Sequence, residues 1–105
     1  MRPDQQQLDE LVRRIVEAVH PLRIILFGSA ARGEMGPDSD VDLLVVMPEG
    51  THRGHTAERI YLSVRRAGIP FEVVVATPSD LEKHRDTPGL VYREVAREGR
   101  TVHAA

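Results

Sequence analysis

The sequence predicts one α/β domain, of the α+β kind, in which a mixed β-sheet is flanked by helices. Three observations lead to this fold class. Segments with a helical period alternate with short apolar runs of strand length along the chain. The length of 105 residues suits a single domain, residues 1–105, with a core of its own. Hydrophobic residues form 41% of the chain and charged residues 29%, a balance that excludes a disordered chain.

The chain is expected to begin with a long helix followed by a strand. The helix covers about 4–19, with Asp4 as its N-cap, and Pro21 ends it. Residues 23–27 form a nearly continuous apolar run, which predicts a strand buried on both faces. The apolar stripe of the helix consists of Leu8, Leu11, Val12, Ile15 and Val19.

The middle of the chain is predicted to hold a helical turn, two strands and a second long helix. The turn covers 29–32, and the second strand covers 40–47. A helix over about 55–67 is followed by Gly68 in the position that ends many helices. The third strand covers 71–76, where β-branched residues follow one another.

Two short helices and an edge strand complete the predicted fold. Residues 77–80 have the composition of a helix start, and this helix ends near Arg85. The last helix covers about 90–97 and is closed by Gly99. Residues 101–103 are expected to add a short edge strand to the sheet.

Composition excludes several classes of protein. The sequence has no cysteine, so a disulfide framework, a thiolate nucleophile and a cysteine-ligated zinc site are all ruled out. Such a chain fits a reducing compartment, and we expect a cytoplasmic location. No segment approaches the roughly 20 apolar residues of a membrane-spanning helix, and the first residues lack the apolar stretch of a signal peptide.

Charge and histidine spacing narrow the expected ligands. The net charge is −2, whereas modules that bind duplex nucleic acid are normally basic, so we expect no direct duplex binding. His52 and His55 have metal-like spacing but no carboxylate close by in sequence, and we expect them to be solvated rather than to bind zinc. Apolar stripes on more than one helix would suit a homo- or hetero-oligomer.

Two aspartates lie at the start of the second predicted strand. Asp40 and Asp42 are two residues apart, so both carboxylates point to the same face of the sheet. Two like charges that are neighbours on one face of a strand are unfavourable unless a cation lies between them. Carboxylate oxygens suit Mg²⁺ or Mn²⁺. The plainer interpretation places both aspartates at a hydrated strand end, without a metal.

A Gly-Ser pair follows the first predicted strand. Gly28 allows a close approach of the backbone, and N–H groups at the start of a helical turn can hold a phosphate. The hydroxyl of Ser29 adds a donor, and the guanidinium of Arg32, one turn later, can bind a phosphate oxygen. The alternative is a tight turn that carries a solvated arginine.

Glu72 is a charged residue inside an otherwise apolar strand. If this strand neighbours the second one, the Glu72 carboxylate would lie about 5 Å from the aspartates. Three carboxylates together could then bind two metal ions. The alternative is an edge strand on which Glu72 faces water.

Taken together, these residues resemble a known family. Gly28-Ser29 is followed after ten residues by Asp40-x-Asp42, with Arg32 and Ser39 in the interval. This pattern is similar to that of the DNA polymerase beta-like nucleotidyltransferases, in particular the minimal nucleotidyltransferases of prokaryotes, which are small partners of HEPN-domain proteins. The motif covers about 26–46, and the order of helices and strands suits the family over nearly the whole chain.

The resemblance implies a nucleotidyltransferase fold, like the palm of polymerase beta, with two Mg²⁺ ions. Asp40 and Asp42 would bind both ions. The third carboxylate of the family is usually an aspartate, and Glu72 stands at the matching position, with one methylene more. This residue would ligate the catalytic metal and help to activate the attacking hydroxyl. Gly28 and Ser29 would hold the β- and γ-phosphates of ATP, with help from Arg32.

The function implied by the resemblance is transfer of AMP from ATP to a hydroxyl of a partner protein, a HEPN-type toxin that the chain neutralises as an antitoxin. One alternative is an antitoxin that keeps the fold but acts by contact alone. Another is a metal-binding domain without a nucleotide, which would leave Gly28 and Ser29 unexplained.

Overall fold

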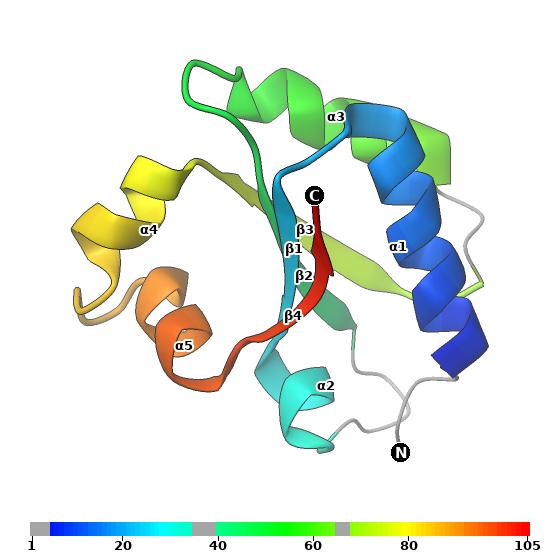
Figure 1. Cartoon of the computed structure of the whole chain (residues 1–105). Coiled ribbons are helices and arrows are strands. Elements are labelled where there is room, and N and C mark those ends of the chain that lie inside the picture. Colours follow the sequence, from blue (N-terminus) through cyan, green and yellow to red (C-terminus); the bar gives the residue numbers. More distant parts are fainter. Residues whose placement is uncertain (1–4, 35–39, 65–67) are drawn as a thin grey trace.

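A four-stranded mixed sheet organises the protein, in the order β3–β2–β1–β4 (Figure 1). The computed structural model describes residues 5–34, 40–64 and 68–105. β1 runs antiparallel to β2 and β4, whereas β2 and β3 are parallel. The strands are β1 (Arg23–Phe27), β2 (Val41–Val46), β3 (Phe71–Ala76) and β4 (Arg100–Ala104). The helices are α1 (Gln5–Val19), α2 (Gly28–Arg32), α3 (Arg53–Val64), α4 (Pro78–His84) and α5 (Val91–Glu98).

The predicted elements are all present, and the bounds of β1 and β3 agree with the prediction residue for residue. α3 begins at Arg53, two residues before the predicted start. Three residues named in the sequence predictions lie outside the described ranges: Asp4, Ser39 and Ala67. No helix within those ranges is long and apolar enough to cross a membrane.

One face of the sheet is covered by α1 and α3 (Figure 1). All five residues of the predicted apolar stripe on α1 are buried. They pack with alternate residues of β1 and β2 and with the inner residues of α3, so this face holds the larger part of the core. The sheet and α3 contribute Ile24, Leu26, Val41, Leu43, Val45, Ile60 and Val64 to it.

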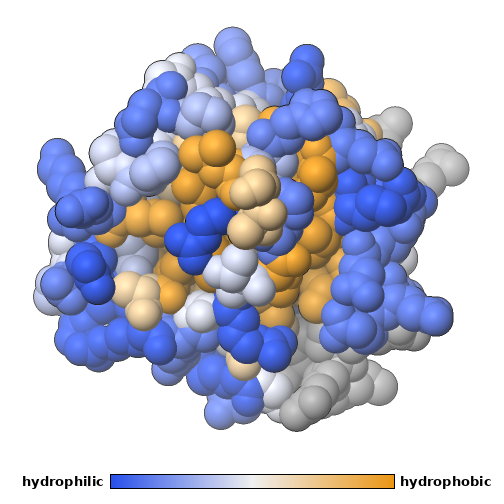
Figure 2. Space-filling view, in the orientation of Figure 1, coloured by the Kyte–Doolittle hydropathy of each residue, from blue (hydrophilic) through white to orange (hydrophobic). Residues whose placement is uncertain are grey.

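The other face is covered by α4 and α5, and its apolar cluster is smaller. α4 buries no residue fully, and α5 buries only Val95. Figure 2 shows apolar surface in the region where these helices meet the sheet. A groove of about 490 Å³ runs between the two helices and β1, with Ile25 and Val46 on its sheet side. The buried sheet residues of this face are Ile25, Phe27, Leu44, Val46 and Ala76.

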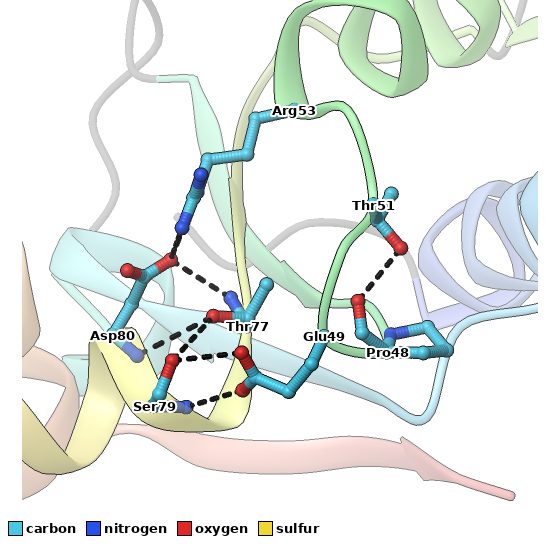
Figure 3. A network of polar contacts seen from close by, with 7 residues as sticks. All are labelled: Pro48, Glu49, Thr51, Arg53, Thr77, Ser79 and Asp80. Atoms are coloured by element: carbon cyan, nitrogen blue, oxygen red, sulfur yellow. Dashed lines mark hydrogen bonds and ion pairs between the residues drawn. The ribbon is translucent and has the colours of Figure 1, made fainter.

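Polar contacts hold α4 where apolar ones are few (Figure 3). The Thr77 hydroxyl accepts from the Asp80 N–H at 3.4 Å, and Asp80 Oδ2 accepts from the Thr77 N–H at 3.0 Å, which completes a capping box. Arg53 Nη2 donates to the same carboxylate oxygen at 2.6 Å. Both carboxylate oxygens of Glu49 accept from Ser79 at 2.8 Å, and these bonds lower the pKa of Glu49. The start of α4 is therefore fastened to the loop that follows β2.

Candidate active site

The two aspartates lie at the start of β2, beside the face that α4 and α5 cover. Val41, Leu43 and Val45 point into the larger core cluster, and Leu44 belongs to the smaller one on the opposite face. Side chains alternate along a strand, so Asp42 shares the face of Leu44. Asp42 is half-buried, and Asp40, just before the strand, is also partly buried. The predicted common orientation of the two carboxylates is thus compatible with the strand.

Glu72 is the direct neighbour of Asp42 across the parallel pair β2–β3. The condition under which the sequence placed Glu72 near the aspartates, a third strand beside the second, is therefore met. β3 is also an edge strand, and Glu72 is exposed. Within the ranges that the structure describes, no three His, Cys, Asp or Glu side chains converge as a ready-made metal cluster. The backbone register brings Glu72 to the site, while its side chain extends into solvent.

Negative charge accumulates around Asp42. Burial raises the pKa of this carboxyl, and the charges of Glu72, Asp40 and Glu94 raise it further. Arg32 opposes the shift. A half-buried carboxylate with three acidic neighbours is a favourable place for a divalent cation, because the cation offsets both the burial and the repulsion. The donor set, all carboxylate oxygen, fits Mg²⁺ or Mn²⁺.

Gly28 joins the two halves of the sequence motif in space. Its φ of +72° is in the left-handed region, and the residue is buried. A Cβ at this position would lie 3.3 Å from Asp42 Cγ and would overlap Asp42 Oδ2. The absence of a side chain therefore lets the turn after β1 pack directly against the carboxylate. The antiparallel pairing of Phe27 with Asp42 brings these segments together.

Ser29 lies in the first turn of α2, which begins directly after β1. The residue is partly buried, and its carbonyl accepts from the Glu34 N–H at 2.8 Å. The first N–H groups of a helix have no acceptor within the helix. The turn that the sequence assigned to phosphate therefore lies next to the carboxylate of Asp42.

Arg32, which the sequence assigned to phosphate, contacts three carboxylates in the structure. Its Nε donates to Glu34 Oε2 at 2.7 Å, and its Nη1 donates to Glu94 Oε1 at 3.1 Å and to Glu98 Oε2 at 2.9 Å. These bonds raise the pKa of the guanidinium, with Glu34 as the largest cause. In this conformation carboxylates occupy the donors that the sequence assigned to phosphate. Glu34 is a local partner, two residues later in the chain, whereas Glu94 and Glu98 reach Arg32 because α5 packs against α2.

Glu94 and Glu98 are the residues that sequence reasoning missed at this site. They are four residues apart on α5, so both carboxylates lie on one side of the helix. Like charges at this spacing destabilise a helix unless a cation lies between them. That pairing was the available signal that α5 faces a cation.

Two large hollows of the surface lie away from Asp40, Asp42 and Glu72. One of about 670 Å³ is bounded by the end of α1 and by α3, and includes His52 and His55. Both histidines are exposed and stack with ring centroids 3.7 Å apart, and His52 Nδ1 accepts from the His55 N–H. Neither this hollow nor the groove beside α4 and α5 includes Asp40, Asp42 or Glu72. The candidate site is therefore defined by the chemistry of its residues and not by either of these two hollows.

Comparisons with known proteins agree with this geometry. Residues 7–100 match the model of the nucleotidyltransferase domain family. No curated protein matches the sequence significantly.

Three solved structures share the fold. A protein from Sulfolobus solfataricus assigned as a nucleotidyltransferase has 16% identity and a TM-score of 0.61, covering 91% of this chain and 76% of its own. A toxin–antitoxin with AMP-PNP has 18% identity and a TM-score of 0.57, covering 92% and 73%. A mutant of the toxin–antitoxin MntA–HpeT has 15% identity and a TM-score of 0.53, covering 98% and 75%. The α+β nucleotidyltransferase fold predicted from the sequence is confirmed.

Proposed function

The chain belongs to the nucleotidyltransferase domain family, and we propose that it is a Mg²⁺-dependent enzyme that transfers AMP from ATP to a hydroxyl of a partner protein. The partner is a HEPN-type toxin, and the chain acts as its antitoxin. One observation carries the proposal: the Gly28 turn packs against the Asp42 carboxylate, so the turn that we assign to phosphate and the carboxylate that we assign to metal lie side by side. Solved neighbours that are toxin–antitoxin structures, one of them with AMP-PNP, support the proposed partner and nucleotide.

The carboxylates of Asp40 and Asp42 would hold two Mg²⁺ ions, and Mn²⁺ has the same ligand preference. When bound, the ions stabilise both the attacking and the leaving oxygen of an in-line displacement. Glu72 is placed by the register beside Asp42, where its carboxylate can complete the ligands. The raised pKa of Asp42 supports this assignment, since a cation relieves the repulsion that raises it.

The nucleotide would be held by the turn after β1. Ser29 and the first N–H groups of α2 bind the β- and γ-phosphates, and Arg32 takes part from the end of the same helix. An acceptor hydroxyl oxygen then bonds to the α-phosphorus as the bond from that phosphorus to the bridging oxygen breaks. Pyrophosphate leaves, AMP stays on the acceptor as an ester, and the exposed Glu72 carboxylate receives the hydroxyl proton.

A second function has its own observation. Glu72 extends into solvent, and no three carboxylates converge within residues 5–34, 40–64 and 68–105. This arrangement favours an antitoxin that neutralises its partner by contact, with the site reduced to nucleotide binding.

Labelled ATP separates the two functions. The purified protein is incubated with Mg²⁺, ATP labelled at the α-phosphate and an extract of its own cells. The test variant is Asp40→Asn/Asp42→Asn. The matched control is Glu58→Gln/Glu82→Gln, which removes two charges from exposed positions on α3 and α4. We expect a labelled protein band with wild type and control only. Label transferred by the aspartate variant would overturn the site assignment, and no label with any protein, together with neutralisation by all three, would establish the contact-only antitoxin.

A further inference from the structure

Arg32 links the two helices that border the candidate nucleotide site. Its guanidinium, at the end of α2, donates to Glu94 and Glu98 on α5, 62 and 66 residues later in the chain. Both bonds come from Nη1, so one nitrogen serves two carboxylates. α2 is also the helix that begins with Gly28 and Ser29. The contact therefore connects α5 to the element proposed to hold the phosphates.

The strength of this contact decides what it can do. The side chain of Arg32 is 36% exposed, and those of Glu94 and Glu98 are 40% and 43% exposed. Exposed ion pairs of this kind contribute little to stability, because water screens them and the side chains lose freedom. α5 adds little apolar anchoring, since Val95 is the only residue that it buries fully. These ion pairs are therefore too weak to hold α2 rigidly, and another anion can replace the two carboxylates at Arg32.

We propose that Glu94 and Glu98 are specificity-determining residues that compete with the phosphate chain of the nucleotide for Arg32. The inference rests on the proposed function. A phosphate group binds a guanidinium through two parallel hydrogen bonds and carries more charge than a carboxylate. A triphosphate seated on the turn at Gly28 reaches Arg32 one turn later and displaces the carboxylates. A monophosphate does not reach Arg32 and leaves the contact in place.

In this competition only a nucleotide with a long enough phosphate chain releases α5 from Arg32. Once Arg32 turns to phosphate, Glu94 and Glu98 are left as like charges four residues apart, close to a polyanion. α5 then loses its ion pairs with α2 and keeps its apolar contacts through Val91, Tyr92 and Val95. The opposite side of α5 lines the groove beside β1 through Tyr92 and Ala96. Binding of a triphosphate would therefore also affect the wall of that groove.

Nucleotide titration tests the competition directly. Dissociation constants for ATP, ADP and AMP are measured by calorimetry with Mg²⁺ for wild type and Glu94→Gln/Glu98→Gln. The control Glu58→Gln/Glu82→Gln also removes two negative charges, but at exposed positions away from Arg32. We expect the α5 variant to bind ATP about three- to ten-fold more tightly, with AMP binding unchanged. Unchanged or weaker ATP binding by this variant, with normal binding by wild type, would overturn the inference and leave the proposed function standing.

A double-mutant cycle separates competition from simple repulsion of the nucleotide. If the carboxylates act through Arg32, then Arg32→Gln abolishes the gain that Glu94→Gln/Glu98→Gln produces. A gain that persists in the Arg32→Gln background means that the carboxylates repel ATP directly, and it overturns the inference. In wild type, hydrogen exchange of residues 91–98 should accelerate with ATP but not with AMP. Wild type that binds no nucleotide overturns the proposed function and, with it, this inference.

Discussion

The two faces of the sheet differ in how they are covered, although the same four strands form both. On one face, α1 buries five residues of its 15 and α3 adds Thr56, Ile60 and Val64. On the other face, α4 buries none and α5 buries one, and α4 is held by hydrogen bonds and an ion pair instead. The carboxylate of Asp42 and the contact of Arg32 with α5 belong to this second, thinner side.

The difference teaches where this small domain can accommodate charge. Half-buried carboxylates and a shared guanidinium both oppose close apolar packing, because charged groups lose hydration when they are buried. They are tolerated because the α1 and α3 face supplies most of the buried apolar surface. Substitutions on the two sides should therefore differ in their effect on stability and on the site.

Truncation of one core side chain on each face should give unequal losses. Leu11→Ala removes a fully buried side chain from α1 and is expected to lower the free energy of unfolding by about 2–5 kcal/mol. Val95→Ala removes one carbon atom fewer than Leu11→Ala, from the less packed α5, and should cost about 1–2 kcal/mol. Urea denaturation measures both. Equal losses would contradict the proposed division of stability between the faces.

Substitution of Gly28 should damage both the site and the fold. Gly28→Ala places a methyl group where it overlaps Asp42 Oδ2 and forces a left-handed backbone on alanine, at a cost of about 1–3 kcal/mol. We also expect loss of ATP binding. Gly50→Ala is the matched control, since Gly50 has φ +86° and no atom within 4 Å of its added Cβ. If Gly50→Ala costs as much, backbone strain alone explains the effect and the contact with Asp42 does not.

Removal of the helix cap should loosen α4 alone. Thr77→Ala deletes the hydroxyl that caps α4 (Figure 3) and should lower the free energy of unfolding by about 1 kcal/mol. Hydrogen exchange should accelerate in 78–84 and not in α1. Thr77→Ser, which keeps the hydroxyl, is the control. Equal acceleration in α1 would show that the two sides unfold as one unit.

The smallest effect should have the opposite sign. Burial and acidic neighbours raise the pKa of Asp42, so its ionised form disfavours the folded state at neutral pH. In a chelating buffer, Asp42→Asn should therefore raise the melting temperature slightly. The gain should shrink as the pH falls through the raised pKa, because wild type then takes up a proton and loses the same repulsion. Asp86→Asn, at an exposed position, is the control. A variant that melts below wild type at neutral pH would contradict the electrostatic account.

The sequence by itself determined the local elements and most of the candidate site. The run at 23–27 is a strand with those bounds because its apolar residues 24–27 are buried on both faces of the sheet. The run at 71–76 is a strand because its successive β-branched residues favour extended backbone. The stripe on α1 is buried as its 3.6-residue period requires. Strand alternation predicted the common orientation of Asp40 and Asp42, because it is a local property. The resemblance to the nucleotidyltransferase motif joined these aspartates and the glycine after β1 into one candidate site.

Tertiary structure alone decided how that site is completed. The register of β2 and β3 sets Glu72 opposite Asp42, and the position of β3 at the sheet edge leaves Glu72 in solvent. The sequence assigned Arg32 to phosphate. The packing of α5 against α2 gives it two carboxylate partners, Glu94 and Glu98. Contacts between residues more than sixty positions apart depend on strand order and helix placement. The spacing of Glu94 and Glu98 indicates a cation beside α5, but only the packing of the whole chain decides that the cation is Arg32.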